Sequence, residues 1–112
     1  MCKYEIEMLD SKSCVQAAHV YRVENGDRFM IGHFVVNTTD KIFSGNALLM
    51  LVFNAVSMCR GVGSRIQINC GSPETKAAVT AAITAPEGDD CESRLVADHL
   101  RYIRSAHAVE IK

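Results

Sequence analysis

One stretch constrains the fold of this chain more than any other, the apolar run NALLMLVFNAVSMCRGV at residues 46–62. Between residues 47 and 58 only Asn54 and Ser57 interrupt the apolar side chains. A membrane-spanning helix needs about 20 predominantly apolar residues, and Gly61 ends this run early. We therefore predict a helix that is buried over most of its circumference and packs against a sheet or a partner.

Alternating segments elsewhere predict the sheet. Residues 3–9, KYEIEML, place Tyr4, Ile6 and Met8 on one face and charged side chains on the other, which is the pattern of a half-buried strand. Residues 64–70, SRIQINC, alternate in the same way. Residues 28–37 are rich in aromatic and β-branched side chains, and we expect them to form a hairpin with residues 41–44.

Three further helices are predicted around these strands. Residues 14–25 place alanine and valine near one helical face, and Asn25 with Gly26 reads as the end of that helix. Residues 74–85 are rich in alanine, with Ser72 as a cap. Residues 89–104 have apolar side chains at spacings near three and four.

The expected fold class is therefore α+β, an open-faced β-α-β-β-α-β-α sandwich with an extra C-terminal helix. We divide the chain into a sandwich domain at residues 1–86 and a helical extension at residues 87–112. One face of such a sheet stays uncovered, so we expect it to be available to a partner or a ligand.

Composition narrows the classes of function. The chain has 112 residues, 48% hydrophobic side chains and a net charge of −1, so no sequence-wide field would draw it to nucleic acid or to a membrane. Its five cysteines form no CxxC motif, and no secretory leader is recognisable, which favours free thiols in the cytoplasm. His99 and His107 are eight residues apart, without the further ligands that a metal site needs, so we expect no metal and no cofactor.

The sequence resembles HPr, the small phosphocarrier protein of the bacterial phosphotransferase system, over about residues 3–85. NALLMLVFNAVSMCRG is similar in register to the family segment NAKSIMGLMSLGISQG, and SRIQINCGSPETKAAVTAAI follows the family order of strand, glycine and acidic helix start. The resemblance implies an HPr-like fold and a place near the phosphotransferase system.

The residues that carry phosphate in that family are missing. Ser13, Cys14 and Val15 stand at the phosphorylation loop, where the family has a pattern close to GLHARPA, and Leu49 stands at the regulatory serine. The resemblance therefore implies that the chain is not an enzyme. We expect a non-catalytic module that binds another protein or a second copy of itself, with regulation as one role for such binding.

A thiol provides the alternative. Cys14 lies near a predicted helix start, where a thiolate is favoured, and His19 follows five residues later. A small thiol-dependent enzyme or a redox switch centred on this pair is the second hypothesis, and selective alkylation of Cys14 would distinguish it.

Overall fold

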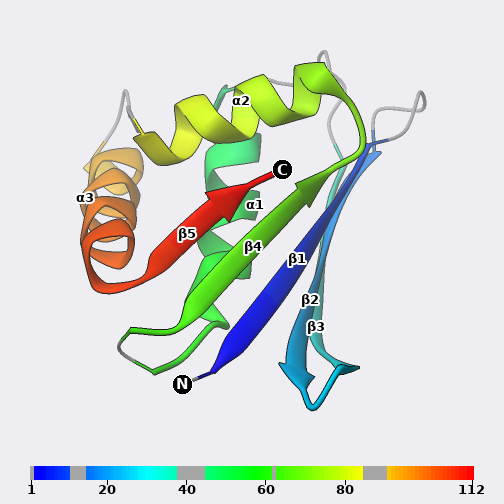
Figure 1. The fold of residues 1–112 in the computed structure, drawn as a ribbon. Coiled ribbons are helices and arrows are strands. Elements are labelled where there is room, and N and C mark those ends of the chain that lie inside the picture. The colour runs from blue at the N-terminus through cyan, green and yellow to red at the C-terminus, as the bar shows by residue number, and fades with distance from the viewer. Residues whose placement is uncertain (1, 11–14, 38–44, 62, 85–90) are drawn as a thin grey trace.

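The chain begins with a meander of three strands. It continues with a segment of helices and two further strands, which join the same sheet (Figure 1). The computed structural model of the chain describes residues 2–10, 15–37, 45–61, 63–84 and 91–112. In chain order the elements are β1 (Lys3–Asp10), β2 (Val15–Glu24), β3 (Asp27–Asn37), α1 (Gly45–Ser57), β4 (Arg65–Cys70), α2 (Pro73–Thr84), α3 (Cys91–Ala106) and β5 (Ala108–Ile111).

One mixed sheet contains all the described strands, in the order β3-β2-β1-β4-β5. The meander is antiparallel, whereas β4 pairs with β1 in parallel and β5 pairs with β4 in parallel. Strand β1 is therefore the centre of the sheet and is flanked by one antiparallel and one parallel neighbour. Parallel pairing of consecutive strands requires a crossover connection, and α2 and α3 form part of the connection between β4 and β5.

The β2–β3 connection is a two-residue hairpin. Asn25 and Gly26 have φ angles of 51° and 84°. Positive φ at both central residues is the requirement of a type I′ turn, for which Asn-Gly is a favoured pair. This dipeptide fixes the register in which Glu24 lies opposite Asp27.

Helices α1, α2 and α3 cover one face of the sheet, and the hydrophobic core lies between the two layers (Figure 1). Alternate residues of the strands enter this core, as the pleat requires. The largest fully buried apolar side chains are Ile6, Leu51, Ile66, Ile68, Leu100, Val20, Val52 and Val79.

The prediction that the apolar run forms a core helix is confirmed. Helix α1 spans Gly45–Ser57, and Leu51, Val52 and Ala55 are each at most 1% exposed. This helix contacts both neighbouring helices and strands β2 and β3. Within the described part of the chain, no helix combines the length and apolar character needed to span a membrane.

The helix predicted at residues 14–25 is wrong, because β2 occupies residues 15–24. Buried side chains recur there with period two, at Ala18 and Val20, and not with helical spacing. Cross-strand pairing with β1 and β3 on both sides overrides the helix-forming tendency of the two alanines.

The hairpin predicted between residues 28–37 and 41–44 stays a prediction, because only its first strand, β3, is described, and β3 pairs with β2. Residues 41–44 lie outside the described residues. The α+β class is confirmed, since the described residues form a five-stranded mixed sheet and three helices. The HPr order of elements is not the one observed, because three strands precede the first helix.

Residues on both sides of position 86 contribute to one core. From α3, Val96, Leu100 and Ile103 pack into the same cluster as the strands. Strand β5 extends the sheet beside β4, where the Lys112 amide donates to the Ile68 carbonyl at 2.8 Å.

Candidate functional site

The face of the sheet opposite the helices carries a polar surface at its centre. On β1, Glu5 and Glu7 occupy the positions that alternate with the buried Tyr4, Ile6 and Met8. In the parallel register Glu5 lies opposite Gln67 and Glu7 lies opposite Asn69. The alternation of both strands therefore brings two carboxylates and two carboxamides together.

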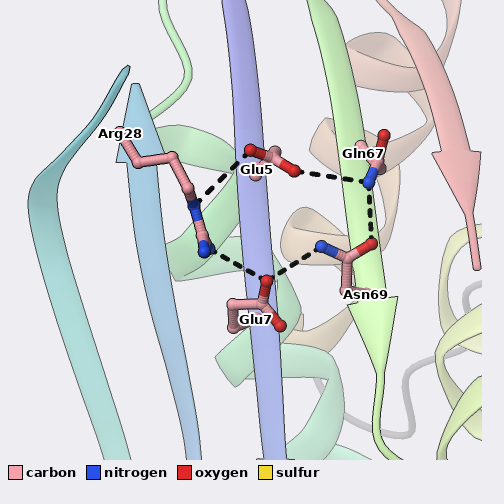
Figure 2. Close-up of polar contacts among 5 residues, drawn as sticks. All are labelled: Glu5, Glu7, Arg28, Gln67 and Asn69. Atoms are coloured by element: carbon pink, nitrogen blue, oxygen red, sulfur yellow. Dashed lines mark hydrogen bonds and ion pairs between the residues drawn. The ribbon is translucent and has the colours of Figure 1, made fainter. Parts of the chain in front are cut away.

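These four side chains and Arg28 form a closed ring of contacts, which we call the polar ring (Figure 2). Arg28 Nη2 donates to Glu7 Oε1 at 2.9 Å, and its Nε lies 3.5 Å from Glu5 Oε2. Asn69 Nδ2 donates to the same Glu7 oxygen at 2.9 Å. Gln67 Nε2 closes the ring, with Asn69 Oδ1 at 2.9 Å and Glu5 Oε1 at 3.4 Å.

Arg28 reaches the ring from β3, across the whole of β2. Its guanidinium carbon lies 4.0 Å from the centre of the Tyr21 ring, a cation–π geometry. The side chains of Glu5 and Glu7 are 18% and 32% exposed and that of Arg28 is 42% exposed. The charges of the ring are therefore partly desolvated and remain accessible from solvent.

A groove with two cations lies next to the polar ring. Its volume is about 370 Å³, and Lys3, Arg65, Gln67 and Glu110 are among its lining residues. Lys3 lies opposite Arg65, two residues before Glu5 and Gln67 on the same strands. Within the described residues neither Lys3 nor Arg65 forms an ion pair, whereas Glu110 lies 3.8 Å from Lys112. Two uncompensated positive charges thus lie beside two carboxylates.

A patch of rings continues the open face on the other side of β1. In one cross-strand row Glu7 lies opposite His19, and His19 lies opposite His33. The His19 ring is 6.4 Å from His33 and 6.5 Å from Tyr21, both edge-to-face. We call Tyr21, His19, His33 and the overlying Arg28 the ring patch.

The donor atoms of the polar ring suit a divalent cation only in part. No group of three or more His, Cys, Asp or Glu side chains in the described part of the chain could hold a metal. Two carboxylates do match the way Mg²⁺ is commonly bound, through one or two carboxylates, several waters and the oxygens of a substrate phosphate. Arg28 balances both carboxylates in the structure, so a metal would have to replace part of its contact.

The one buried thiol in the described part of the chain, that of Cys59, shows no sign of activation. Among the described residues, Cys2, Cys59 and Cys70 form no disulfide with one another. Cys59 is buried just after the end of α1, and its thiol contacts the Ala55 carbonyl at 3.8 Å. Burial raises the pKa of Cys59 to about 12, which keeps it protonated at neutral pH. This thiol therefore behaves as a core side chain.

Most site residues predicted from the sequence are not brought together. Ser13 and Cys14 lie outside the described residues. Val15 begins strand β2, so the helix start implied by the phosphorylation loop is not there. Leu49 lies within α1. His19 lies on the open face of the sheet with Tyr21 and His33 as its ring neighbours.

The polar ring was missed because its signal is spread over the whole chain. The alternation of β1 and β4 shows that Glu5, Glu7, Gln67 and Asn69 point away from the core. Only the pairing register brings residues 62 positions apart into contact. Arg28 could be placed only after β2 and β3 were recognised as a hairpin.

Comparison with known proteins identifies the fold. No protein-family model matches the sequence, and no curated protein matches it. Among solved structures, the chain is similar to RNase H1 from the halophilic archaeon Halobacterium salinarum NRC-1, with a TM-score of 0.51 and 12% identity over 99% of this chain and 83% of that one. At this identity the likeness shows an RNase H-like fold and nothing finer.

Weaker likenesses are found to a second group of structures. A PPX-GPPA enzyme of Aquifex aeolicus has a TM-score of 0.38 and 7% identity over 99% of this chain. Another structure of an Aquifex aeolicus member of the Ppx/GppA family has a TM-score of 0.36 and 9% identity. The chain spans about a third of the length of these proteins, covering 36% and 35% of them, and the likenesses carry no argument.

These findings correct the functional predictions. The resemblance to HPr is wrong, since the strand order and the likeness to the RNase H1 structure point to an RNase H-like fold. The non-catalytic HPr-like module and the connection to the phosphotransferase system fail with it. The prediction that the chain is not an enzyme rested on that resemblance and is withdrawn, because the fold is shared with an RNase H1. The alternative of a thiol enzyme on Cys14 and His19 is not supported either.

Proposed function

We propose that the chain binds a polynucleotide on the open face of its sheet and hydrolyses a phosphodiester bond there. The observation that carries this proposal is the juxtaposition of an uncompensated cation pair, Lys3 and Arg65, with the carboxylate pair Glu5 and Glu7 on the same strands. The fold shared with an RNase H1 supports the choice of reaction, although fold alone does not determine function.

The cation pair supplies the phosphate contact. Lys3 and Arg65 project from neighbouring strands into one groove of about 370 Å³. Lysine and arginine donors bind phosphate oxygens as charge-assisted hydrogen bonds, and arginine can do so with two parallel bonds. Successive same-face positions on a strand are about 6.6 Å apart. A phosphate held by this pair would therefore lie next to Glu5.

The carboxylate pair supplies the reactive end. Glu5 and Glu7 would hold a divalent cation together with substrate oxygens, and the cation would neutralise charge on the phosphate and acidify a bound water. In hydrolysis the oxygen of water bonds to phosphorus, the ester P–O bond breaks, and the leaving oxygen takes a proton. Arg28 contacts both carboxylates and offsets their mutual repulsion, and the cation would replace part of that contact.

This proposal departs from the expectation that the chain avoids nucleic acid. That expectation rested on a net charge of −1, which averages over the whole sequence. On the open face the carboxylates of the polar ring are already paired with Arg28, whereas Lys3 and Arg65 are not paired within the described residues. We also propose that the protein works in the cytoplasm, where thiols such as Cys2 stay reduced.

The test is cleavage of end-labelled 20-mers by the full chain. Single-stranded RNA, single-stranded DNA and an RNA–DNA hybrid are incubated with Mg²⁺ or with EDTA, and the products are resolved on a denaturing gel. We expect cleavage in Mg²⁺ only. Replacing one carboxylate, Glu5→Gln or Glu7→Gln, should slow cleavage by about 100-fold, the usual scale for losing one electrostatic contact in the transition state.

Glu24→Gln is the matched control, since Glu24 pairs with Arg22 at the turn end of β2 and alternates with the positions that lie on the open face. Its rate should equal that of the unmodified chain. The proposal fails if the folded protein cleaves none of the substrates. It also fails if Glu5→Gln and Glu7→Gln, purified in the same way, cleave as fast as Glu24→Gln.

A further inference from the structure

We infer that the open face takes its polynucleotide as a single strand, with the backbone on Lys3 and Arg65 and the bases on the ring patch. This inference rests on the proposed function and specifies its substrate class. It is carried by a second feature of the same face, the flat groups that lie side by side on β2 and β3.

The ring patch offers planar surfaces that no described helix or strand covers. His19 and Tyr21 alternate with the buried Ala18 and Val20, so they lie on the face away from the helices. His33, which lies opposite His19, is exposed. Exposed Met30 and Val35 border the patch, at 50% and 57% exposure. Rings and apolar side chains are therefore exposed to solvent side by side on the open face of the sheet.

Arg28 makes the patch continuous. Its guanidinium group lies over Tyr21 and is held in place by Glu5 and Glu7 from the side of β1. With 42% of the side chain exposed, its outer plane remains available for stacking. Nucleobases stack on arginine planes and on histidine and tyrosine rings alike.

The two halves of the face have complementary roles for an unpaired strand. His19 lies opposite Glu7, which is four residues along β1 from Lys3. At roughly 3.3 Å per residue, the histidine level of the sheet is therefore about 13 Å from the level of Lys3. A phosphate backbone can follow the cation pair while its splayed bases reach the rings. In a duplex the bases are stacked on each other and cannot turn onto a flat sheet, so only the backbone contacts would remain.

The experiment measures binding by fluorescence anisotropy in EDTA, where no hydrolysis is expected, so its outcome is independent of cleavage. The probes are a labelled 12-mer RNA, its duplex with the complementary strand, and an abasic 12-mer of the same length. The full chain should bind the single strand at least tenfold more tightly than the duplex or the abasic strand, since stacking of one base on an aromatic side chain is worth about tenfold or more.

Variants separate stacking from charge. The double change of His19→Ala with His33→Ala should weaken single-strand binding by about tenfold or more and leave abasic binding unchanged. Arg28→Lys keeps the charge and removes the plane, and it should also lower the affinity for the single strand only. His99→Ala, a change of an exposed histidine on α3, is the control and should bind as the unmodified chain does. Thermal unfolding checks that each variant is folded.

Each outcome decides the inference. Equal affinity for the three probes overturns it and leaves the proposed hydrolysis standing if cleavage is seen. Single-strand binding that survives the histidine changes and Arg28→Lys also overturns it. Selective binding without cleavage by any assay confirms the inference about the ligand and refutes the proposed hydrolysis.

Discussion

The guanidinium carbon of Arg28 lies 4.0 Å from the centre of the Tyr21 ring, and from there its nitrogens reach Glu5 and Glu7 on the strand beyond. One side chain of β3 thus links the edge of the sheet to its central strand. The Tyr21 ring packs against one face of the guanidinium group, and the carboxylates of Glu5 and Glu7 bind its nitrogens. The effect of these Arg28 contacts on the stability of the fold can be tested separately from their effect on binding.

Arg28→Met should lower the free energy of unfolding by about 1 kcal/mol, because it leaves Glu5 and Glu7 as like charges on one face without a cation between them. The loss should shrink at high salt, which screens the repulsion. Urea unfolding at low and high ionic strength measures both effects. Arg22→Met is the matched control, since Arg22 and Glu24 are each about half exposed and their removal should cost little. Equal losses for both variants would contradict the role of Arg28.

The raised pKa of the buried Cys59 thiol predicts that the protein loses stability at alkaline pH. Burial raises its pKa from 9.0 to about 12 in the folded protein. The stabilisation is fully present below pH 9, where both states hold the proton, and is lost as the pH rises from 9 toward 12, because only the unfolded thiol ionises. The slope should reach up to about 1.4 kcal/mol per pH unit. Urea unfolding at several pH values from 8 to 11 measures it.

Cys59→Ala removes this contribution and should flatten the slope without abolishing it. Tyr4 contributes in the same direction, because burial raises its pKa as well. A Cys59→Ala slope as steep as that of the unmodified chain would show that the thiol does not take part.

Ser72→Ala should destabilise the chain by about 1 kcal/mol through loss of the N-cap of α2. The Thr75 amide donates to Ser72 Oγ at 3.1 Å, as a capping residue requires. Ser72→Asp retains an acceptor and adds a negative charge at the helix start, so it should restore the stability. Thermal or urea unfolding distinguishes the two. The same loss in both variants would mean that the hydroxyl acts through other contacts.

Lys3→Gln combined with Arg65→Gln should reduce the salt dependence of single-strand binding. Each phosphate contact contributes about −0.7 to the slope of log K against log salt concentration, so removing two should make it shallower by about 1.4. Anisotropy titrations over a range of salt concentrations measure the slope. Lys76→Gln, an exposed lysine on α2, is the control and should leave it unchanged. An unaltered slope in the double variant would place the backbone elsewhere.

Some elements could be predicted from the sequence because their signals are local. Strands at residues 3–9 and 64–70 follow from alternation, and the observed β1 and β4 span Lys3–Asp10 and Arg65–Cys70. The cap at Ser72 and the apolar helix α1 also follow from neighbouring residues. In each case the side chains that decide the structure lie within one segment.

The errors arose where distant pairing decides the structure. Asn25-Gly26 was interpreted as a helix end, although the same dipeptide between apolar runs is a strong hairpin signal, and its positive φ angles form the turn. Because of this one error, residues 15–24 were predicted as a helix and not as strand β2, and the predicted order of elements became HPr-like. Without β2, Arg28 could not be placed near Glu5 and Glu7. The polar ring could not be predicted, because neither the sequence of β1 nor that of β4 determines the register in which the two strands pair.

The central parallel pair has a consequence for how the chain folds. Strands β1, β2 and β3 are joined by short connections and can associate early. Strand β1 meets β4 only after a loop of some 60 residues closes, and the backbone amide of Arg65 then donates to the Cys2 carbonyl at 3.0 Å. Such non-local contacts slow folding. We therefore expect the docking of β4 to limit the rate, so that the polar ring, which spans this junction, assembles at the last step.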